Sequence, residues 1–270
     1  MLDKLQTELK IRGFSQKTID SYLLHNKLFL NYINKQPENI EEQDIKNYLA
    51  YLMDKNYKPR SISLALSSLK FFYHNILNKT ILTNIKAPKL DKKIPTVLTN
   101  EEVKSLLNAL TNIKHKILIS LMLSSGLRVS EAVSVKTDEI NFNDHTLIVR
   151  SGKGKKDRIT IVSEKLLEDI KAYLAKRKDK NPHLFPIRDT HVTIKLAQKI
   201  IKQAARKANL NKRIYCHALR STFATNLMNN GVNLRFIQSL LGHANLSTTE
   251  AYTKVNTEEL KKIKNPLDYL

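Results

Sequence analysis

The chain has 270 residues, enough for one large or two modest domains, and its apolar content of 41% is that of an ordinary globular protein. An excess of 46 lysines and arginines over 25 acidic residues gives a formal net charge of +21, which predicts binding to a polyanion such as nucleic acid. The sequence contains no run of about 18 apolar residues that would predict a membrane span, and residues 1–30 do not resemble a secretory signal. Cys216 is the only cysteine, which excludes an internal disulfide and a cysteine-based metal site. A cytoplasmic setting is therefore expected.

The basic charge is spread along the chain. Residues 1–90 and residues 91–270 each carry more basic than acidic side chains. Charge alone does not separate DNA from RNA, and it leaves open a solubilising surface or a protein that binds membrane surfaces. Nucleic acid is the favoured partner, because the composition is that of a folded chain.

Residues 1–83 are predicted to form a small bundle of four helices. Apolar residues recur at helical spacing within residues 19–33, 45–52 and 62–76. Ser15 is a suitable N-cap for the first of these stretches, and Pro59 suits the first turn of the last one. Their short connections are typical of a bundle.

Residues 84–95 interrupt the helical pattern and are predicted to be an extended, basic linker. The segment contains two prolines and four lysines and has little apolar surface to bury. A strap of this kind would let two domains close around a duplex, with Lys92 and Lys93 in contact with its backbone. An ordinary surface loop is the alternative.

Residues 96–270 are predicted to form a second domain of α+β structure. Thr99-Asn100-Glu101-Glu102 is a capping box before its first helix. Residues 146–150 and 158–162 are β-type runs joined by a turn rich in glycine and lysine. Helices are expected at about 100–110, 114–125 (ending at Gly126), 164–176, 192–208, 217–229, 233–241 and 247–253. The whole chain is therefore expected to be mainly α, with a small antiparallel sheet.

Arg128 is the first of several polar residues that carry chemistry. It stands in Ser125-Gly126-Leu127-Arg128-Val129-Ser130-Glu131, at the start of a predicted helix that includes Glu131. A guanidinium offers a planar fork to two phosphate oxygens and stays charged at any working pH. Glu131 is expected to orient the Arg128 side chain without contacting the phosphate. A helix-surface arginine paired with Glu131 is the simpler alternative.

Lys153 lies in Ser151-Gly152-Lys153-Gly154-Lys155-Lys156-Asp157-Arg158. Glycines on both sides allow a tight turn with the lysine at its tip. The basic residues that follow are candidates for contacts with a nucleic-acid backbone: Lys155, Lys156 and Arg158. The alternative is a merely solvated hairpin tip.

His217 and Arg220 are three residues apart, so they share one face of a helix. One side chain can donate a hydrogen bond to a phosphate oxygen while the other neutralises the charge that grows in the transition state. Such a pair alone is mostly a surface feature. Cys216 points about 100° away from His217, so it is predicted to pack rather than to form a Cys–His nucleophilic pair. None of the eight histidines has zinc-type spacing, and no metal is expected.

His243 follows Leu240-Leu241-Gly242, where the glycine is predicted to end a helix. Tyr252 comes next among the polar candidates, directly after Ser247-Thr248-Thr249-Glu250-Ala251. A tyrosine hydroxyl can attack phosphorus without a metal. By itself His243 is more typical of a capping group, and Tyr252 is one of ten tyrosines.

In this order, the motifs resemble those of the tyrosine recombinase, or phage integrase, family, most closely its Xer type. The resemblance covers essentially the whole chain and implies an N-terminal SAM-like core-binding domain and a C-terminal catalytic domain. The residues that it assigns to the scissile phosphate are Arg128, His217, Arg220 and His243. It assigns Tyr252 as the nucleophile and Lys153 as the general acid for the leaving 5′ oxygen, with a pKa lowered by neighbouring cations. Ser221 departs from the family pattern, which commonly has histidine there, and this puts supporting contacts in doubt.

The resemblance also implies a reaction. Double-stranded DNA would be cut and rejoined at a specific site through a 3′-phosphotyrosyl link, with no metal or nucleotide cofactor. Four protomers would assemble on two DNA sites, each docking a C-terminal tail on a neighbour. The Gly-Leu-Arg-Val-Ser-Glu match favours resolution of chromosome dimers at a dif-like site, and Asn265-Pro266-Leu267-Asp268 is similar to the archaeal Xer branch. A partner recombinase or a DNA translocase is left open.

Three rival functions are weighed against this one. An integrase or transposase of a mobile element would use the same chemistry for another task. An enzyme similar to type IB topoisomerases would relax supercoils without joining partners. A non-catalytic DNA-binding regulator would need neither Tyr252 nor the two arginines Arg128 and Arg220.

Overall fold

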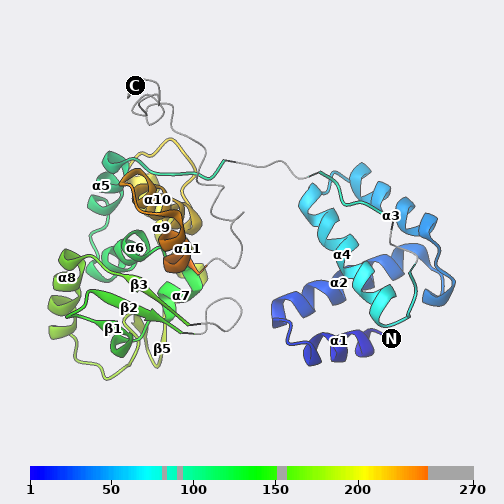
Figure 1. Cartoon of the computed structure of the whole chain (residues 1–270), viewed down its shortest axis with the longest axis horizontal. Coiled ribbons are helices and arrows are strands. Elements are labelled where there is room, and N and C mark those ends of the chain that lie inside the picture. The colour runs from blue at the N-terminus through cyan, green and yellow to red at the C-terminus, as the bar shows by residue number, and fades with distance from the viewer. Residues whose placement is uncertain (81–83, 90–93, 151–156, 243–270) are drawn as a thin grey trace, which may run out of the picture. The chain divides into compact units, whose positions relative to one another are not determined.

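The structure, a computed structural model, describes residues 1–80, 84–89, 94–150 and 157–242 (Figure 1). The chain divides into two compact units, Met1–Lys93 and Ile94–Leu270, and each has a hydrophobic core of its own. The predicted fold class is confirmed, because the chain is mainly helical and its small sheets are antiparallel. Within the described ranges, no helix is long and apolar enough to cross a membrane.

The N-terminal unit is a helical bundle. Its α-helices are α1 (Leu2–Ile11), α2 (Gln16–Ile33), α3 (Glu42–Asp54) and α4 (Pro59–Asn75), with a 3₁₀ turn, η1, at Pro37–Asn39. The two predicted start signals are confirmed: the Ser15 hydroxyl accepts a hydrogen bond from the Thr18 amide, and Pro59 occupies the first turn of α4. Phe29 of α2 and Tyr73 of α4 meet in the core with ring centroids 6.3 Å apart. Burial of these apolar faces, more than helix propensity, stabilises the helices.

One residue of the predicted linker packs on this bundle. Ile85 is 7% exposed and belongs to the N-terminal core. The Lys70 ammonium donates a hydrogen bond to the Ile85 carbonyl at 2.8 Å. The segment that follows α4 is therefore fastened to its own unit by an apolar contact that the prolines and lysines of residues 84–95 did not indicate.

The C-terminal unit is built around helix α6. Its α-helices are α5 (Asn100–Asn108), α6 (Ile113–Ser125), α7 (Val129–Ser134), α8 (Glu164–Ala175), α9 (Ile194–Lys207), α10 (Cys216–Asn229) and α11 (Leu234–Leu241). Helix α6 packs against α5, α7, α8 and α10, and most of its side chains from Ile117 to Met122 are buried. The predicted capping box before α5 is confirmed. The Thr99 hydroxyl accepts a hydrogen bond from the Glu102 amide, and the Glu102 carboxylate accepts one from the Thr99 amide.

Two small antiparallel sheets complete the C-terminal unit. The first contains β1 (Ile140–Asn141), β2 (Thr146–Val149) and β3 (Arg158–Ile161), preceded by the 3₁₀ turn η2 (Thr137–Glu139), and the second contains β4 (Pro186–Ile187) and β5 (Thr190–His191). In β3 the isoleucines face outward, with Ile159 59% exposed. Thr160 is buried and donates a hydrogen bond to the Ser125 carbonyl at 2.9 Å. Strand β3 therefore directs polar side chains toward the end of α6.

Candidate active site

Gly126 sets the position of Arg128. It ends α6 with a left-handed φ of 60°, and its amide bonds to the Met122 carbonyl. A Cβ at this position would overlap the Phe223 ring and lie 2.9 Å from the Leu241 side chain. Only glycine combines this backbone conformation with so close an approach to α10 and α11. Arg128 follows two residues later as the N-cap of α7.

Glu131 lies under Arg128, in contact with two arginines. Its carboxylate accepts hydrogen bonds from the Arg128 amide at 2.8 Å and from Arg128 Nη1 at 2.7 Å. It also accepts bonds from Arg158 Nη1 and Nη2 at 2.9 and 2.7 Å. Burial by itself raises the pKa of Glu131, but the bonds from Arg158 and the Arg128 amide, with the Arg158 charge, lower that pKa to about 2. Glu131 is therefore ionised at any working pH, in the position that the sequence predicted for an orienting residue.

Arg158, predicted as a DNA-backbone contact, is placed inside the C-terminal unit. Its side chain is only 9% exposed and forms an ion pair with Glu131. Its Nε donates a third hydrogen bond, to the Leu240 carbonyl at 2.9 Å. The neighbouring glycine and lysines indicated a solvated turn, whereas β3 directs Arg158 inward. The guanidinium is therefore used inside the protein.

Arg220 is buried, which excludes the surface alternative for this residue. It is 1% exposed on α10, although the sequence placed it on a helix with polar neighbours. Its Nη1 donates to the Gly126 carbonyl and its Nη2 to the Leu241 carbonyl, both at 2.5 Å. Arg220 thus links the end of α6 to the end of α11, next to Arg128.

His217 lies close enough to the two arginines for their charges to act on it, and its side chain is partly buried and partly open to solvent. Partial burial of the side chain lowers its pKa, and the positive charges of Arg220 and Arg128 lower the same pKa further. A neutral imidazole can donate one hydrogen bond and accept another. Ser221, where the family commonly has histidine, donates to the His217 carbonyl at 3.0 Å.

Cys216 is a packing residue, as predicted. It is 7% exposed and belongs to the core of the C-terminal unit. Burial raises the pKa of its thiol, so the nucleophilic thiolate form is disfavoured.

Three arginines converge on the last carbonyl groups of α11. Arg158 Nε binds the Leu240 carbonyl, Arg220 Nη2 binds the Leu241 carbonyl, and Arg128 Nη2 lies 3.4 Å from the Gly242 carbonyl. Carbonyl groups at a helix C-terminus lack intrahelical partners and carry the negative end of the helix dipole. The arrangement collects three cationic side chains from α7, β3 and α10 at one point, immediately before His243 in the sequence.

Several predicted site residues lie outside the described residues. They are Lys92, Lys93, Lys153, Lys155, Lys156, His243 and Tyr252. The structure brings together Arg128, Glu131, His217 and Arg220 from the predicted set. It adds Arg158 to them in a different role. Among the residues described, no group of three His, Cys, Asp or Glu side chains is placed to hold a metal ion.

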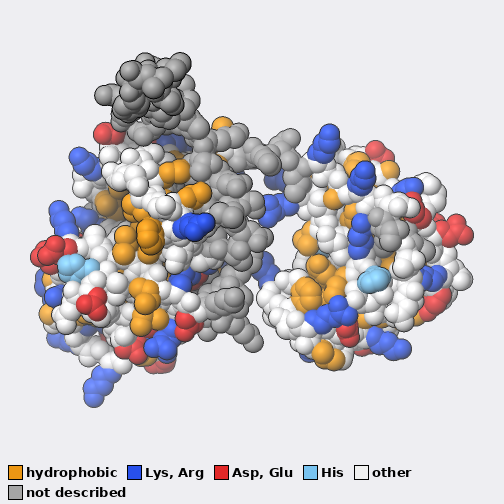
Figure 2. All heavy atoms as spheres, viewed as in Figure 1, with side chains coloured by type: hydrophobic (Ala, Val, Ile, Leu, Met, Phe, Trp, Pro, Cys, Tyr) orange, Lys and Arg blue, Asp and Glu red, His pale blue; other side chains and the backbone are white. Residues whose placement is uncertain are grey.

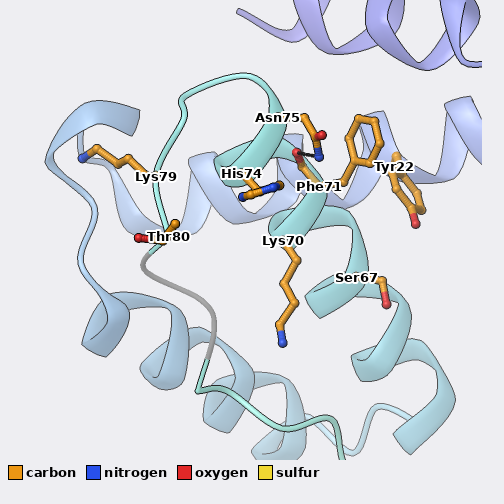
Figure 3. A pocket seen from close by; sticks show the side chains of 8 residues that line it. All are labelled: Tyr22, Ser67, Lys70, Phe71, His74, Asn75, Lys79 and Thr80. Carbon is orange, nitrogen blue, oxygen red and sulfur yellow. Dashed lines mark hydrogen bonds between the residues drawn. The ribbon is translucent and has the colours of Figure 1, made fainter.

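Each unit also has a hollow on its surface. A groove of about 670 Å³ in the C-terminal unit runs between α5, α6, α8 and α10, with Val103, Leu107 and Leu227 among its lining side chains. A pocket of about 390 Å³ in the N-terminal unit is lined by Lys70, His74 and other side chains, mostly from α4 (Figure 3). Both hollows are largely apolar, and the rings of Tyr22 and Phe71 form part of the wall of the second.

Known families match both units. The phage integrase family matches residues 96–259, and its N-terminal SAM-like domain matches residues 1–83. The tyrosine recombinase XerA of Pyrococcus horikoshii is 36% identical over 97% of this chain and 91% of its own length. The tyrosine recombinase XerD of Rickettsia bellii is 35% identical over 96% of this chain and 94% of its own length.

Solved structures share the fold. A crystal structure of a XerA recombinase is 31% identical with a TM-score of 0.57, covering 97% of this chain and 95% of that chain. A XerH recombinase bound to palindromic difH DNA has a TM-score of 0.76 at 24% identity, over 97% of this chain and 82% of that chain, which shows a common fold. The family matches and the identities over nearly the full length agree with the order of motifs around Arg128, His217 and Arg220. The chain therefore belongs to the phage integrase family and is a tyrosine recombinase.

Proposed function

We propose that this protein is a site-specific DNA recombinase that cuts and rejoins double-stranded DNA through a covalent link between Tyr252 and a 3′ phosphate. The observation that carries the proposal is the convergence of Arg128 and Arg220 at the end of α11. The chain continues from this point through His243 to Tyr252. The nucleophile therefore follows closely in sequence on the carbonyl groups that the two arginines bind. A fold shared with recombinases bound to DNA supports the same partner here.

The two arginines and His217 suit the chemistry of a phosphodiester. The Tyr252 oxygen attacks phosphorus and gives up its hydroxyl proton to water, the bond to the 5′ oxygen breaks, and Lys153 donates a proton to that oxygen. A 5′ hydroxyl from a partner duplex then gives its proton to Lys153 and attacks the phosphotyrosine, and the released tyrosine oxygen takes a proton from water, so the number of phosphodiester bonds is unchanged. Arg128 and Arg220 neutralise the oxygens of the five-coordinate transition state, and His217 donates a hydrogen bond to one of them.

Both units contribute to DNA binding in this proposal. Figure 2 shows lysine and arginine side chains on each of them. The predicted linker of residues 84–95 joins two domains, 1–83 and 96–270, that close on the duplex. Lys92, Lys93, Lys155 and Lys156 contact its backbone.

Resolution of chromosome dimers at a dif-like site is the biological task that we favour. Relatives named XerA and XerD align with nearly all of this chain. The second candidate is integration of a mobile element, because a relative from Sinorhizobium fredii that is 33% identical over 99% of this chain is named a putative integrase/recombinase. Recombination between two copies of a chromosomal dif-like site supports the first task, and activity confined to the ends of an element supports the second.

Four protomers on two DNA sites, active in pairs, would carry out strand exchange. The tail at residues 257–270 carries Leu260 and Ile263 three residues apart, the spacing of one helical face. The apolar groove between α5 and α10 offers a neighbouring protomer a surface that fits such a face. A head-to-tail contact of this kind closes into a ring when the rotation between protomers allows it.

Single-turnover cleavage of a nicked suicide substrate tests the proposed activity. The wild-type chain is expected to form a covalent protein–DNA adduct at one phosphate of its target site. Arg128→Ala is expected to slow adduct formation by about 10²–10³ at saturating DNA, because one preorganised donor to the phosphate is lost. Arg206→Ala is the control, since this arginine is exposed in the last turn of α9. An Arg128→Ala rate near that of the wild type would remove Arg128 from the phosphate site.

A further inference from the structure

Arg158 is bound at three points by two other elements of the C-terminal unit. Its Nη1 and Nη2 donate to the two carboxylate oxygens of Glu131 on α7, and its Nε donates to the Leu240 carbonyl of α11. A planar guanidinium with two parallel bonds to a carboxylate fixes direction as well as distance. Strand β3 thus joins the helix that starts at Arg128 to the helix that ends before His243.

The ion pair between Arg158 and Glu131 determines how strongly Glu131 binds Arg128. One oxygen of Glu131 accepts bonds from both arginines, at 2.7 Å from Arg128 Nη1 and 2.9 Å from Arg158 Nη1. Because Arg158 shares this negative charge, the three side chains together carry one net positive charge. Without Arg158, the Arg128–Glu131 pair would be neutral, and the whole carboxylate would compete with phosphate for Arg128.

The stem of Arg158 also supports the end of α11. A Cβ added at Gly242 would lie 2.8 Å from Arg158 Cδ, so the turn after α11 packs directly on this side chain. Gly242 has a left-handed φ of 63°, and its carbonyl lies 3.4 Å from Arg128 Nη2. Displacement of Arg158 would therefore disturb both Arg128 and the point from which the chain continues to His243.

We propose that Arg158 is a positioning residue for strand cleavage. It fixes Glu131 so that Arg128 faces the scissile phosphate, and it anchors the end of α11 from which the chain runs to His243 and Tyr252. It does not touch DNA itself. The proposal rests on the proposed recombinase function. It assigns Arg158 to contacts with Glu131 and Leu240 inside the protein, in place of a contact with a DNA phosphate.

Two variants and one matched control test the proposal. Arg158→Gln removes the charge and the fork, and Arg158→Lys keeps the charge but cannot bind two carboxylate oxygens and a carbonyl with the same geometry. Arg177→Gln is the control, because Arg177 is also 9% exposed but binds the Asp179 carboxylate and the carbonyls of Asn181 and His183 instead of Glu131 and Leu240. Thermal unfolding of each variant shows whether the fold is kept.

Cleavage and DNA affinity are then measured separately. Both Arg158 variants are expected to cleave a suicide substrate about 10–100-fold more slowly at saturating DNA, the cost of a misplaced catalytic group. The slope of log affinity against log salt is expected to stay at the wild-type value, since no phosphate contact is lost, whereas loss of one contact would reduce it by about 0.9. Arg177→Gln is expected to cleave at the wild-type rate.

The result that would overturn the proposal is a folded Arg158→Gln variant that cleaves within twofold of the wild type at saturating DNA. A reduced salt slope with unchanged cleavage would return Arg158 to the DNA backbone. If Arg158→Gln does not fold, Arg158→Lys decides, and wild-type cleavage by that variant overturns the proposal.

A second readout does not depend on cleavage. In full-length protein with ¹⁵N-labelled arginine, the Arg128 Nε–H signal is expected to shift in both Arg158 variants relative to the wild type and to Arg177→Gln, because the Glu131 carboxylate that binds Arg128 is no longer shared with Arg158 in the same geometry. An unchanged signal would contradict the positioning role. A wild-type chain that forms no adduct on any recombination site would refute the proposed function, and the NMR measurement would still decide the role of Arg158.

Discussion

At the residue scale, His217 differs from the arginines around it because its charge depends on pH. Partial burial lowers the pKa of its imidazole, and the charges of Arg220 and Arg128 lower the pKa further. In an unfolded chain the same group titrates near pH 6.5. Protonation of His217 therefore opposes folding, and the stability associated with the neutral ring is lost as the pH falls below about 6.5.

We predict that His217 in the DNA-free protein titrates with a midpoint below pH 6.5 in an NMR titration of its ring nitrogens. In Arg128→Ala the midpoint is expected to rise, because one of the positive charges near the ring is removed. Arg206→Ala, on the exposed surface of α9, serves as the control and is expected to leave the midpoint unchanged. A wild-type midpoint above 6.5 would show that an anionic group of the protein dominates the environment of His217.

The contacts of residues whose partners are close in the chain could be predicted from the sequence, whereas the internal contacts of Arg158 could not. Ser15 and Thr99 cap helices whose first amides lie three residues away, so their roles follow from local spacing. The partners of Arg158 are Glu131 and Leu240, which only the tertiary fold brings near. The alternation in β3 also differs from an apolar-inward pattern, because Thr160 faces inward and Ile159 outward.

At the scale of elements, the end of α6 depends on the absence of a side chain at Gly126. We predict that Gly126→Ala lowers the free energy of unfolding, measured by denaturant titration of the full chain. Its Cβ would meet Phe223 and Leu241 in the packed contact between α6, α10 and α11. The left-handed backbone adds about 1–2 kcal/mol, and overpacking adds about 1–3 kcal/mol.

Gly231 provides the matched control for this substitution. It has a left-handed φ of 78°, but a Cβ there would meet nothing within 4 Å. Gly231→Ala is expected to show only the backbone cost, of about 1–2 kcal/mol. Equal losses in the two variants would mean that the contact of Gly126 with α10 and α11 is not tightly packed.

Long elements were predicted well from the sequence, and two-residue strands were not. Helices α6, α8, α9 and α10 begin and end within a few residues of the expected ranges. Each spans several turns, and in α8 and α9 apolar residues recur at helical spacing. Strands β1, β4 and β5 contain two residues each and carry no periodic signal. They form because hydrogen bonds already hold the segments around them in place. The Thr137 amide donates to the Pro182 carbonyl, and the Leu184 amide donates to the Val135 carbonyl.

At the scale of the whole molecule, DNA binding is predicted to require both units. Residues 96–270 have their own core and are expected to fold when expressed alone. This fragment should bind a target duplex more weakly than the full chain and with a shallower dependence of log affinity on log salt, because phosphate contacts of the N-terminal unit are lost. Fluorescence anisotropy over a range of salt measures both quantities. Full affinity with an unchanged slope would remove the idea of a clamp.

Assembly on DNA is predicted to depend on the tail. Deletion of residues 257–270 should spare binding to a single DNA site and abolish complexes that hold two sites, as measured by native gel shift. A charge placed in the groove, Leu107→Glu, should have the same effect if the groove receives the tail of a neighbour. Normal two-site complexes from the deletion would show that the tail packs only on its own domain.

Tyr252 is predicted to carry the DNA, and locating the covalent link tests this claim. Trypsin is expected to release residues 236–254 from the trapped adduct, and Tyr252 is the only tyrosine of this peptide. Mass spectrometry should find a nucleotide on the Tyr252 oxygen, and Tyr252→Phe should bind DNA but form no adduct. A nucleotide on any other residue, or an adduct that persists in Tyr252→Phe, would contradict the claim.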